Sequence, residues 1–265
     1  MSWTRMRGLA TAVTRACRTG KSAGILLSAL AGWLPTQSAS ADGERMLVFT
    51  KTVGYRHDSI PAAIAAIRTL AARHGIEIDH TEDAATFHRD KLSGFKVVAF
   101  VNTTGNVLDG EQQRAFEAFV AGGGGYLGVH SAADTGYDWP WYGDLVGAWF
   151  KSHPPGLQTG TVRFARPLGG SWPVAWRVTD EFYNFRSRPK GEAALVAALD
   201  ESTYEGGEMG PDHPISWCQK VYGGRSWYTG LGHRPELFVN AVLWSISKKG
   251  CFTRCLDPTT VRCMS

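Results

Sequence analysis

Short runs of consecutive apolar residues recur through the first half of the chain, each with Gly, Thr or Asn at one or both ends. Runs of this length and composition are typical of strands that are buried on both faces of a parallel sheet. The sequence therefore predicts buried strands at residues 46–49, 95–101 and 126–129, with a shorter strand at 76–78.

Between these runs, apolar residues recur at helical spacing. One helix is expected from residue 60, with Ser59 as its N-cap and with Gly75 ending it in a left-handed turn. A second helix is expected from Asp109, because Gln112 stands where the partner residue of a capping box belongs. Strands and helices alternate in the order of an α/β fold with a doubly wound, mostly parallel sheet of the flavodoxin-like type.

The second half of the chain is rich in Trp, Tyr, Pro and Gly from about Asp134 onward. Loop-rich β additions to the parallel core are expected there, at residues 161–164, 194–200, 215–221 and 227–231, followed by a closing helix from Leu237 to Ser247. The sequence shows no internal repeat and no low-complexity linker, so it predicts a single α/β domain over residues 42–250.

The N-terminal residues have the pattern of a secretory signal. A basic start without acidic residues precedes an apolar stretch from Ala23 to Leu34 and the small residues Ser38–Ala41. We therefore expect residues 1–41 to be a signal peptide and the protein to be exported, to the periplasm or the extracellular medium. The alternative is a retained anchor, but the stretch is shorter than the roughly 20 apolar residues that a membrane span needs.

Cleavage at this point would change both the cysteine count and the charge. The remaining cysteines are Cys218, Cys251, Cys255 and Cys263, of which three fall in a C-terminal tail, residues 251–265. An even number in an exported protein favours a disulfide staple. The formal charge of +4 comes partly from the basic leader, so the rest of the chain is close to neutral. That balance argues against nucleic acid and, after cleavage, against membranes as partners.

Polar residues follow the predicted strands, at the places where doubly wound sheets bind their ligands. His57 comes after the first strand, Asn102 and Thr103 come after the third, and His130 and Asp134 come after the fourth. A glycine-rich turn and a strand precede His130, which places this histidine at a sharp strand-to-helix bend, where hydrolases hold a nucleophile. The alternative for His130 is a structural role in holding the loop.

Imidazoles exchange protons near neutral pH, so His130 and His233 are candidate catalytic groups, with Glu181 or Asp134 assisting. Imidazoles could also bind a divalent metal such as zinc and leave an open coordination position. The candidate ligands are His130, His153, His213 and His233. Their spacing is not that of a known metal motif, so no cofactor is certain.

Seven segments in this order resemble the trehalose-utilisation (ThuA-like) family, whose fold belongs to the class I glutamine amidotransferase-like group. They are Gly54–Ile60, Asn102–Gly105, Gly123–Ala132, Asp138–Tyr142, Asp180–Phe185, Asp212–Trp217 and Gly223–His233. The wider group has a Cys nucleophile at the bend where this chain has His130. Without a thiolate there, the resemblance does not imply glutaminase activity.

The resemblance implies sugar metabolism, with trehalose, a related disaccharide or glycoside, or a 3-keto-glycoside made by an upstream sugar dehydrogenase as substrate. The residues expected to stack on sugar rings are Trp139, Trp141, Trp217 and Tyr228. Those expected to bind the substrate through polar contacts are His57, Asn102, Thr103 and Arg225, and Arg225 would also steady negative charge. The alternative function is a non-catalytic sugar-binding or interaction domain that lost the nucleophile.

Overall fold

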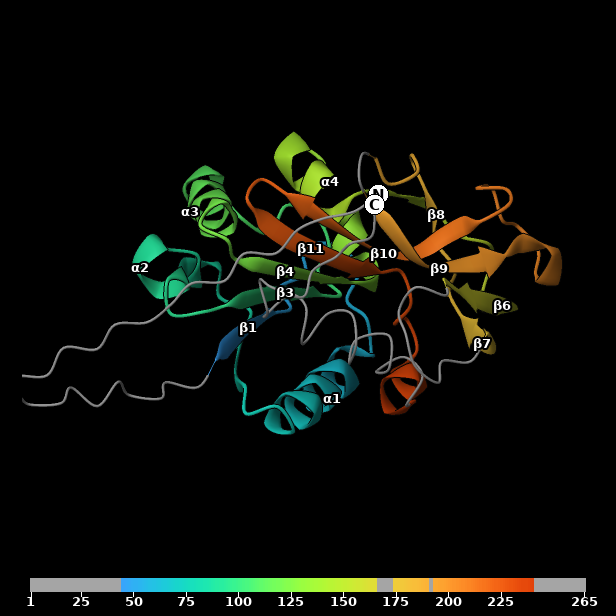
Figure 1. Ribbon diagram of the computed structural model, residues 1–265, viewed down its shortest axis with the longest axis horizontal. Coiled ribbons are helices and arrows are strands. Elements are labelled where there is room, and N and C mark those ends of the chain that lie inside the picture. Colours follow the sequence, from blue (N-terminus) through green and yellow to red (C-terminus); the bar gives the residue numbers. More distant parts are fainter. Residues whose placement is uncertain (1–43, 166–173, 191–192, 241–265) are drawn as a thin grey trace, which may run out of the picture. The chain divides into compact units, whose positions relative to one another are not determined.

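One mixed sheet organises the computed structural model, which describes residues 44–165, 174–190 and 193–240 (Figure 1). Its parallel half has the order β2-β1-β3-β4-β11. The strands of that half are β1 (Arg45–Phe49), β2 (Glu77–Thr81), β3 (Val97–Val101), β4 (Gly125–Val129) and β11 (Gly224–Thr229). The strands predicted in the first half of the chain are therefore present, and the predicted α/β class is confirmed.

The second half of the chain extends the same sheet with antiparallel strands. Next to β11 follow, in this order, β10 (His213–Val221), β9 (Ala194–Asp200), β6 (Gln158–Phe164) and β7 (Ala175–Asp180). The short strands β5 (Phe150–Ser152) and β8 (Asn184–Phe185) pair separately. The additions predicted at 161–164, 194–200 and 215–221 are thus present as β6, β9 and β10. The one predicted at 227–231 is β11 of the parallel half, and β7 was not predicted. Over the described residues the main sheet has nine strands.

Helices cover both faces of the parallel half, as a doubly wound sheet requires. In Figure 1, α3 (Gly110–Ala121) and α4 (Pro140–Val146) lie above the sheet and α1 (Ile60–Ala72) lies below it. The remaining helical elements are α2 (Arg89–Leu92), η1 (Ala84–Thr86), η2 (His130–Asp134), η4 (Glu201–Thr203) and η5 (Pro235–Val239). Among the residues that the structure describes, no helix combines the length and the apolar character needed to cross a bilayer.

The two N-terminal helix caps predicted from the sequence have different outcomes. Asp109 accepts from the backbone of Gln112, whose side chain accepts from the backbone of Asp109, so the capping box is present. Ser59 does not cap α1. Its hydroxyl donates instead to the carbonyl of Gly232, 2.9 Å away. This prediction was wrong because a distant loop competes for the serine side chain.

The carboxyl ends of β1, β3, β4 and β11 lie at one edge of the sheet, because these strands are parallel. Loops 50–59, 102–109, 130–139 and 230–234 leave from that edge. The predicted signal peptide at 1–41, the predicted tail at 251–265 and the part of the predicted closing helix beyond residue 240 lie outside the described residues.

Candidate functional site

His130 occupies the bend between β4 and η2, in a backbone conformation that residues other than glycine rarely adopt. Its φ is 50°, in the left-handed region, where a residue other than glycine is held only by its surroundings. Tyr228 donates its hydroxyl to the carbonyl of His130 at 2.8 Å. Nδ1 of His130 lies 2.7 Å from the carbonyl of Gly230, which can only accept. The neutral ring therefore carries its proton on Nδ1 and keeps a lone pair on Nε2.

Two further imidazoles face His130 across a small space. The ring centroids of His57 and His130 are 4.8 Å apart, those of His57 and His233 are 5.2 Å apart, and those of His130 and His233 are 5.5 Å apart. The three ring planes stand at 76° to 89° to one another. They come from the loops after β1, β4 and β11, so the shared edge of the sheet brings them together.

Glu181, directly after β7, supplies the carboxylate of this group. One of its oxygens, Oε2, lies 3.4 Å from Nε2 of His130 and 3.3 Å from Nδ1 of His233. One donor or acceptor atom from each of His57, His130, Glu181 and His233 lies within 4.8 Å of the others. We refer to these four residues as the His–Glu cluster.

Burial and charge set the protonation of the cluster. Burial is the largest of the causes that lower the pKa of His57 to about 3, and positive charge on His130 and His233 acts in the same direction. Burial would raise the pKa of Glu181, but the adjacent His130 and His233 more than offset this and hold it well below its ordinary value. Glu181 raises the pKa of His233 despite partial burial. The cluster therefore combines an ionised carboxylate with a neutral His57.

His153 lies at the rim of the cluster, on the other side of Glu181. Its Nε2 is 3.4 Å from Oε1 of Glu181, and its side chain is 39% exposed. Its Nδ1 lies 2.8 Å from the carbonyl of Pro154, which fixes the proton on Nδ1 in the neutral ring. Asp134, another predicted catalytic residue, is partly buried and accepts from the hydroxyl of Tyr137 at 2.6 Å. Burial raises the pKa of Asp134.

Buried polar residues behind the cluster hold its loops in place. Asp180, fully buried, accepts from the backbone N–H groups of Gly232 at 2.8 Å and Arg234 at 3.1 Å, which fixes the loop that carries His233. Asn102 donates to Ser59 and to the carbonyl of Gly232. These bonds join the loops after β1, β3, β7 and β11 around one centre.

The comparisons with known proteins agree with this architecture. A model of the family described as "Trehalose utilisation" (ThuA) matches residues 45–252, which is most of the chain. The chain belongs to the ThuA family. A ThuA-like protein from Bacteroides uniformis superposes with a TM-score of 0.66 at 23% identity, over 80% of this chain and 93% of that one. A ThuA-like protein from Parabacteroides merdae does so with a TM-score of 0.57 at 18% identity, over 78% and 91%. A search of curated proteins gave no match.

Several aromatic residues predicted to stack on sugars lie in the core of this ThuA family member. Trp217 and Tyr228 are fully buried and pack on each other at 4.5 Å, and Trp217 donates to the carbonyl of Val146. Trp139 is 6% exposed and stacks on Tyr142. These three rings have no face open to a sugar, so their predicted role is corrected. Trp141, partly buried, is covered by stacking on Trp139 and Tyr222.

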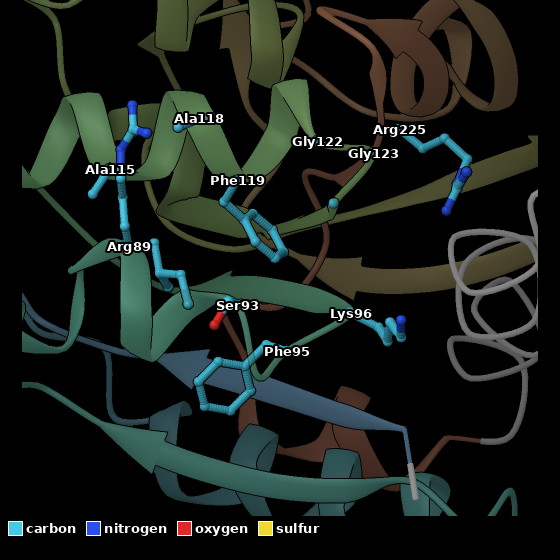
Figure 2. A pocket seen from close by; sticks show the side chains of 12 residues that line it. Arg89, Ser93, Phe95, Lys96, Ala115, Ala118, Phe119, Gly122, Gly123 and Arg225 are labelled. Atoms are coloured by element: carbon cyan, nitrogen blue, oxygen red, sulfur yellow. The ribbon is translucent and has the colours of Figure 1, made fainter. Parts of the chain in front are cut away.

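Arg225 lies at the opposite edge of the sheet from the His–Glu cluster. It stands at the amino end of β11, paired with Gly125 at the start of β4. Figure 2 shows it with Lys96 beside a surface pocket that Gly122 and Gly123 also line. It therefore cannot steady charge on a substrate at the cluster. The sequence shows that Arg225 follows Gly223 and Gly224, but it did not show that these glycines lie at the amino end of β11.

Two other predicted site residues have their polar atoms engaged within the protein. Both ring nitrogens of His213 are engaged, Nδ1 with Glu201 at 2.9 Å and Nε2 with the carbonyl of Tyr183 at 2.8 Å, so the predicted metal ligand is a structural residue. Thr103 is buried and pairs with Thr135 at 2.8 Å. Its hydroxyl is thereby occupied within the protein.

One exposed aromatic residue beside the cluster was missed. Tyr55 is 63% exposed, and its ring meets His57 edge-on at 4.8 Å. Its position in the polar loop after the first predicted strand was the available signal, since that loop also carries His57. The ThuA family member therefore offers an open aromatic face next to its histidines.

Proposed function

We propose that the protein is a carbohydrate-active enzyme that acts on a disaccharide, glycoside or 3-keto-glycoside at the His–Glu cluster. The observation that carries the proposal is the gathering of His57, His130, Glu181 and His233 at the carboxyl edge of the sheet, with His153 at the rim. Perturbed titratable groups held together at the ligand-binding edge are typical of catalytic sites. We do not propose a glutamine amidotransferase reaction, because the bend carries His130 and offers no thiol as nucleophile for that route.

The keto-glycoside reaction suits these groups best. A ketone at C3 acidifies the hydrogen on C2, and a base takes that proton. The electron pair of the C–H bond forms a C1=C2 double bond while the glycosidic oxygen leaves C1 and receives a proton. The products are a free sugar and an unsaturated ketone, and no oxidant or reductant is consumed.

His153 is the best placed residue to move these protons. His130 was predicted to do so, but it is fully buried and its Nδ1 is engaged with Gly230. His153 contacts Glu181 and also reaches solvent, so a proton taken from the substrate can pass to water. The open ring of Tyr55 next to His57 provides a surface on which a pyranose ring can stack.

The sequence suggests where the protein acts and what supplies its substrate. We propose export by the N-terminal segment 1–41, whose basic and apolar regions have the order of a secretory signal. A 3-keto-glycoside must be made by oxidation of a secondary hydroxyl, so the supplying reaction is that of a sugar dehydrogenase.

Direct incubation with candidate substrates tests the proposal. Trehalose, sucrose and their 3-keto derivatives are incubated with the full chain, with and without zinc, and the products are followed by mass spectrometry and proton NMR. We expect release of a free sugar from a keto substrate. His153→Gln should slow turnover by about 10²–10⁴-fold, the usual contribution of a general acid or base. His88→Gln, which changes an exposed histidine at the start of α2, is the control.

A second candidate is a non-catalytic sugar-binding domain, favoured by the histidine at the bend where the wider group has its nucleophile. Calorimetry that shows tight binding of a sugar that remains unchanged after long incubation would favour this function and overturn the enzymatic one. If the unchanged protein is active and His153→Gln is equally active, the enzymatic function stands and only the role of His153 is wrong.

A further inference from the structure

We infer that the His–Glu cluster is a binding site for one divalent metal ion of the zinc type, with His57, His130, Glu181 and His233 as ligands. The set differs from the histidines that the sequence suggested, because it includes His57 and Glu181 and excludes His153 and His213. This inference goes beyond the proposed sugar chemistry and does not depend on it.

The separations between ligand atoms fit a common central ion. Two ligands about 2.0–2.1 Å from zinc at tetrahedral angles lie about 3.4 Å apart. Oε2 of Glu181 is 3.4 Å from Nε2 of His130 and 3.3 Å from Nδ1 of His233. The three imidazole planes stand at steep angles to one another, as expected for ligands that approach one point from different directions.

Two of the nitrogens are buried without a hydrogen bond. Among the described residues, Nε2 of His130 and Nδ1 of His233 have no partner in hydrogen-bonding geometry, although a carboxylate oxygen is within 3.4 Å of each. Buried polar atoms are almost always satisfied. An ion between the two nitrogens and the carboxylate satisfies all three groups at once, which a single shared proton cannot do.

Outer hydrogen bonds orient the rings toward the cluster. Nδ1 of His130 donates to the carbonyl of Gly230, so its Nε2 lone pair is available to an ion. Nδ1 of His57 lies 3.3 Å from the hydroxyl of Ser131. With Nδ1 donating to that hydroxyl, Nε2 of His57 also keeps its lone pair. Carbonyl and hydroxyl partners of this kind are typical of metal-binding histidines.

The position of His153 distinguishes it from the proposed metal ligands. It contacts Oε1 of Glu181, whereas His130 and His233 contact Oε2. It is also the more exposed residue, at 39% against 26% for His233 and 0% for His130. We therefore place His153 outside the ligand set.

Metal binding is tested on the full chain, independently of any activity. The protein is treated with a chelator, dialysed and titrated with Zn²⁺ by calorimetry, and its metal content after loading is measured by elemental analysis. We expect one ion per chain at the cluster. His130→Gln and His233→Gln should weaken binding by more than the roughly 10–100-fold typical of losing an outer-shell partner. His153→Gln should bind zinc as the unchanged protein does.

Cobalt provides a second readout that does not depend on a variant folding. Co²⁺ bound by nitrogen and oxygen atoms shows visible bands without the intense near-ultraviolet band of a thiolate ligand, which separates the cluster from the cysteines of the tail. Circular dichroism verifies the fold of each variant. The inference is overturned if the unchanged chain takes up no metal at the cluster, or if His130→Gln and His233→Gln bind as tightly as the unchanged chain.

Discussion

A histidine that binds a metal ion has to be uncharged, and burial keeps His57 in that state at neutral pH. Its side chain lies among two other imidazoles, and the residue is only 5% exposed. Burial, together with positive charge on His130 and His233, lowers its pKa to about 3, although Glu181 acts in the opposite direction. His57 is thereby kept neutral at neutral pH.

This pKa predicts how stability depends on pH in the metal-free protein. Between pH 6.5 and about 3, the unfolded state binds a proton at His57 that the folded state does not. The stability contribution of the neutral ring is therefore present above pH 6.5 and is lost as the pH falls through that window. His57→Gln should reduce the slope of unfolding free energy against pH by up to one proton, about 1.4 kcal/mol per pH unit.

Urea unfolding of chelator-treated protein at several pH values between 6.5 and 4.5 measures this slope. Glu181 also takes up a proton on unfolding near the lower limit, because its folded-state pKa is lowered from 4.5, and the comparison with the variant removes this contribution. His80 and His213 also have lowered pKa values, so the comparison with the variant isolates His57. Equal slopes for the two proteins would contradict the prediction.

At the scale of elements, the antiparallel half of the sheet places the carboxylate among histidines from the parallel half. Glu181 follows β7, at the far end of the sheet order from β1 and β2. Asp180 connects this strand to the loop that carries His233, through the backbone N–H groups of Gly232 and Arg234. His213 of β10 holds the carbonyl of Tyr183, two residues after Glu181.

Asp180→Asn tests this connection. An amide has one acceptor oxygen where the carboxylate has two, so one buried N–H group loses its partner, at a cost of about 1–3 kcal/mol. We also expect weaker zinc binding by about 10–100-fold, because Asp180 positions His233 without itself being a ligand. Thermal unfolding and zinc titration give the two quantities.

The matched control is Asp83→Asn. Asp83 is exposed and caps η1 through the backbone of Ala85, and asparagine caps helices about as well as aspartate does. It should therefore keep both stability and zinc affinity. Zinc affinity that is unchanged in Asp180→Asn would show that the loop of His233 is held by other contacts.

The sequence was sufficient to predict α3 and β4 because the patterns that specify them are local. The capping box at Asp109 depends on residues three apart, and the strand before His130 depends on a continuous apolar run. Ser59 shows the limit of that reasoning: its local pattern predicted a cap, but its hydroxyl bonds Gly232, which is distant in the sequence. A competing partner of that kind has no local signal.

At the scale of the whole molecule, the sequence predicted the edge of the sheet that collects the histidines but not the environment of each side chain. Trp217 and Tyr55 are both aromatic residues in polar segments, yet Trp217 is fully buried and Tyr55 is 63% exposed. Trp217 lies against the end of α4, whose carbonyl at Val146 accepts from its indole N–H, whereas Tyr55 lies in the loop after β1. The predicted role of Arg225 was wrong because β11 runs parallel to β4, which places Arg225 at the end of the sheet away from the cluster. The direction of that strand has no local signal in the sequence.

The four proposed ligands come from segments that are far apart in the chain, after β1, β4, β7 and β11. An ion that binds all four stabilises the folded state relative to an unfolded chain in which they are separated. Zinc at about 100 times its dissociation constant should add about 2.7 kcal/mol to the free energy of unfolding. The melting temperature should therefore rise with zinc concentration and fall on chelation, as measured by calorimetry. His130→Gln should show a much smaller response, and an equal response in both proteins would mean that zinc stabilises the fold from another site.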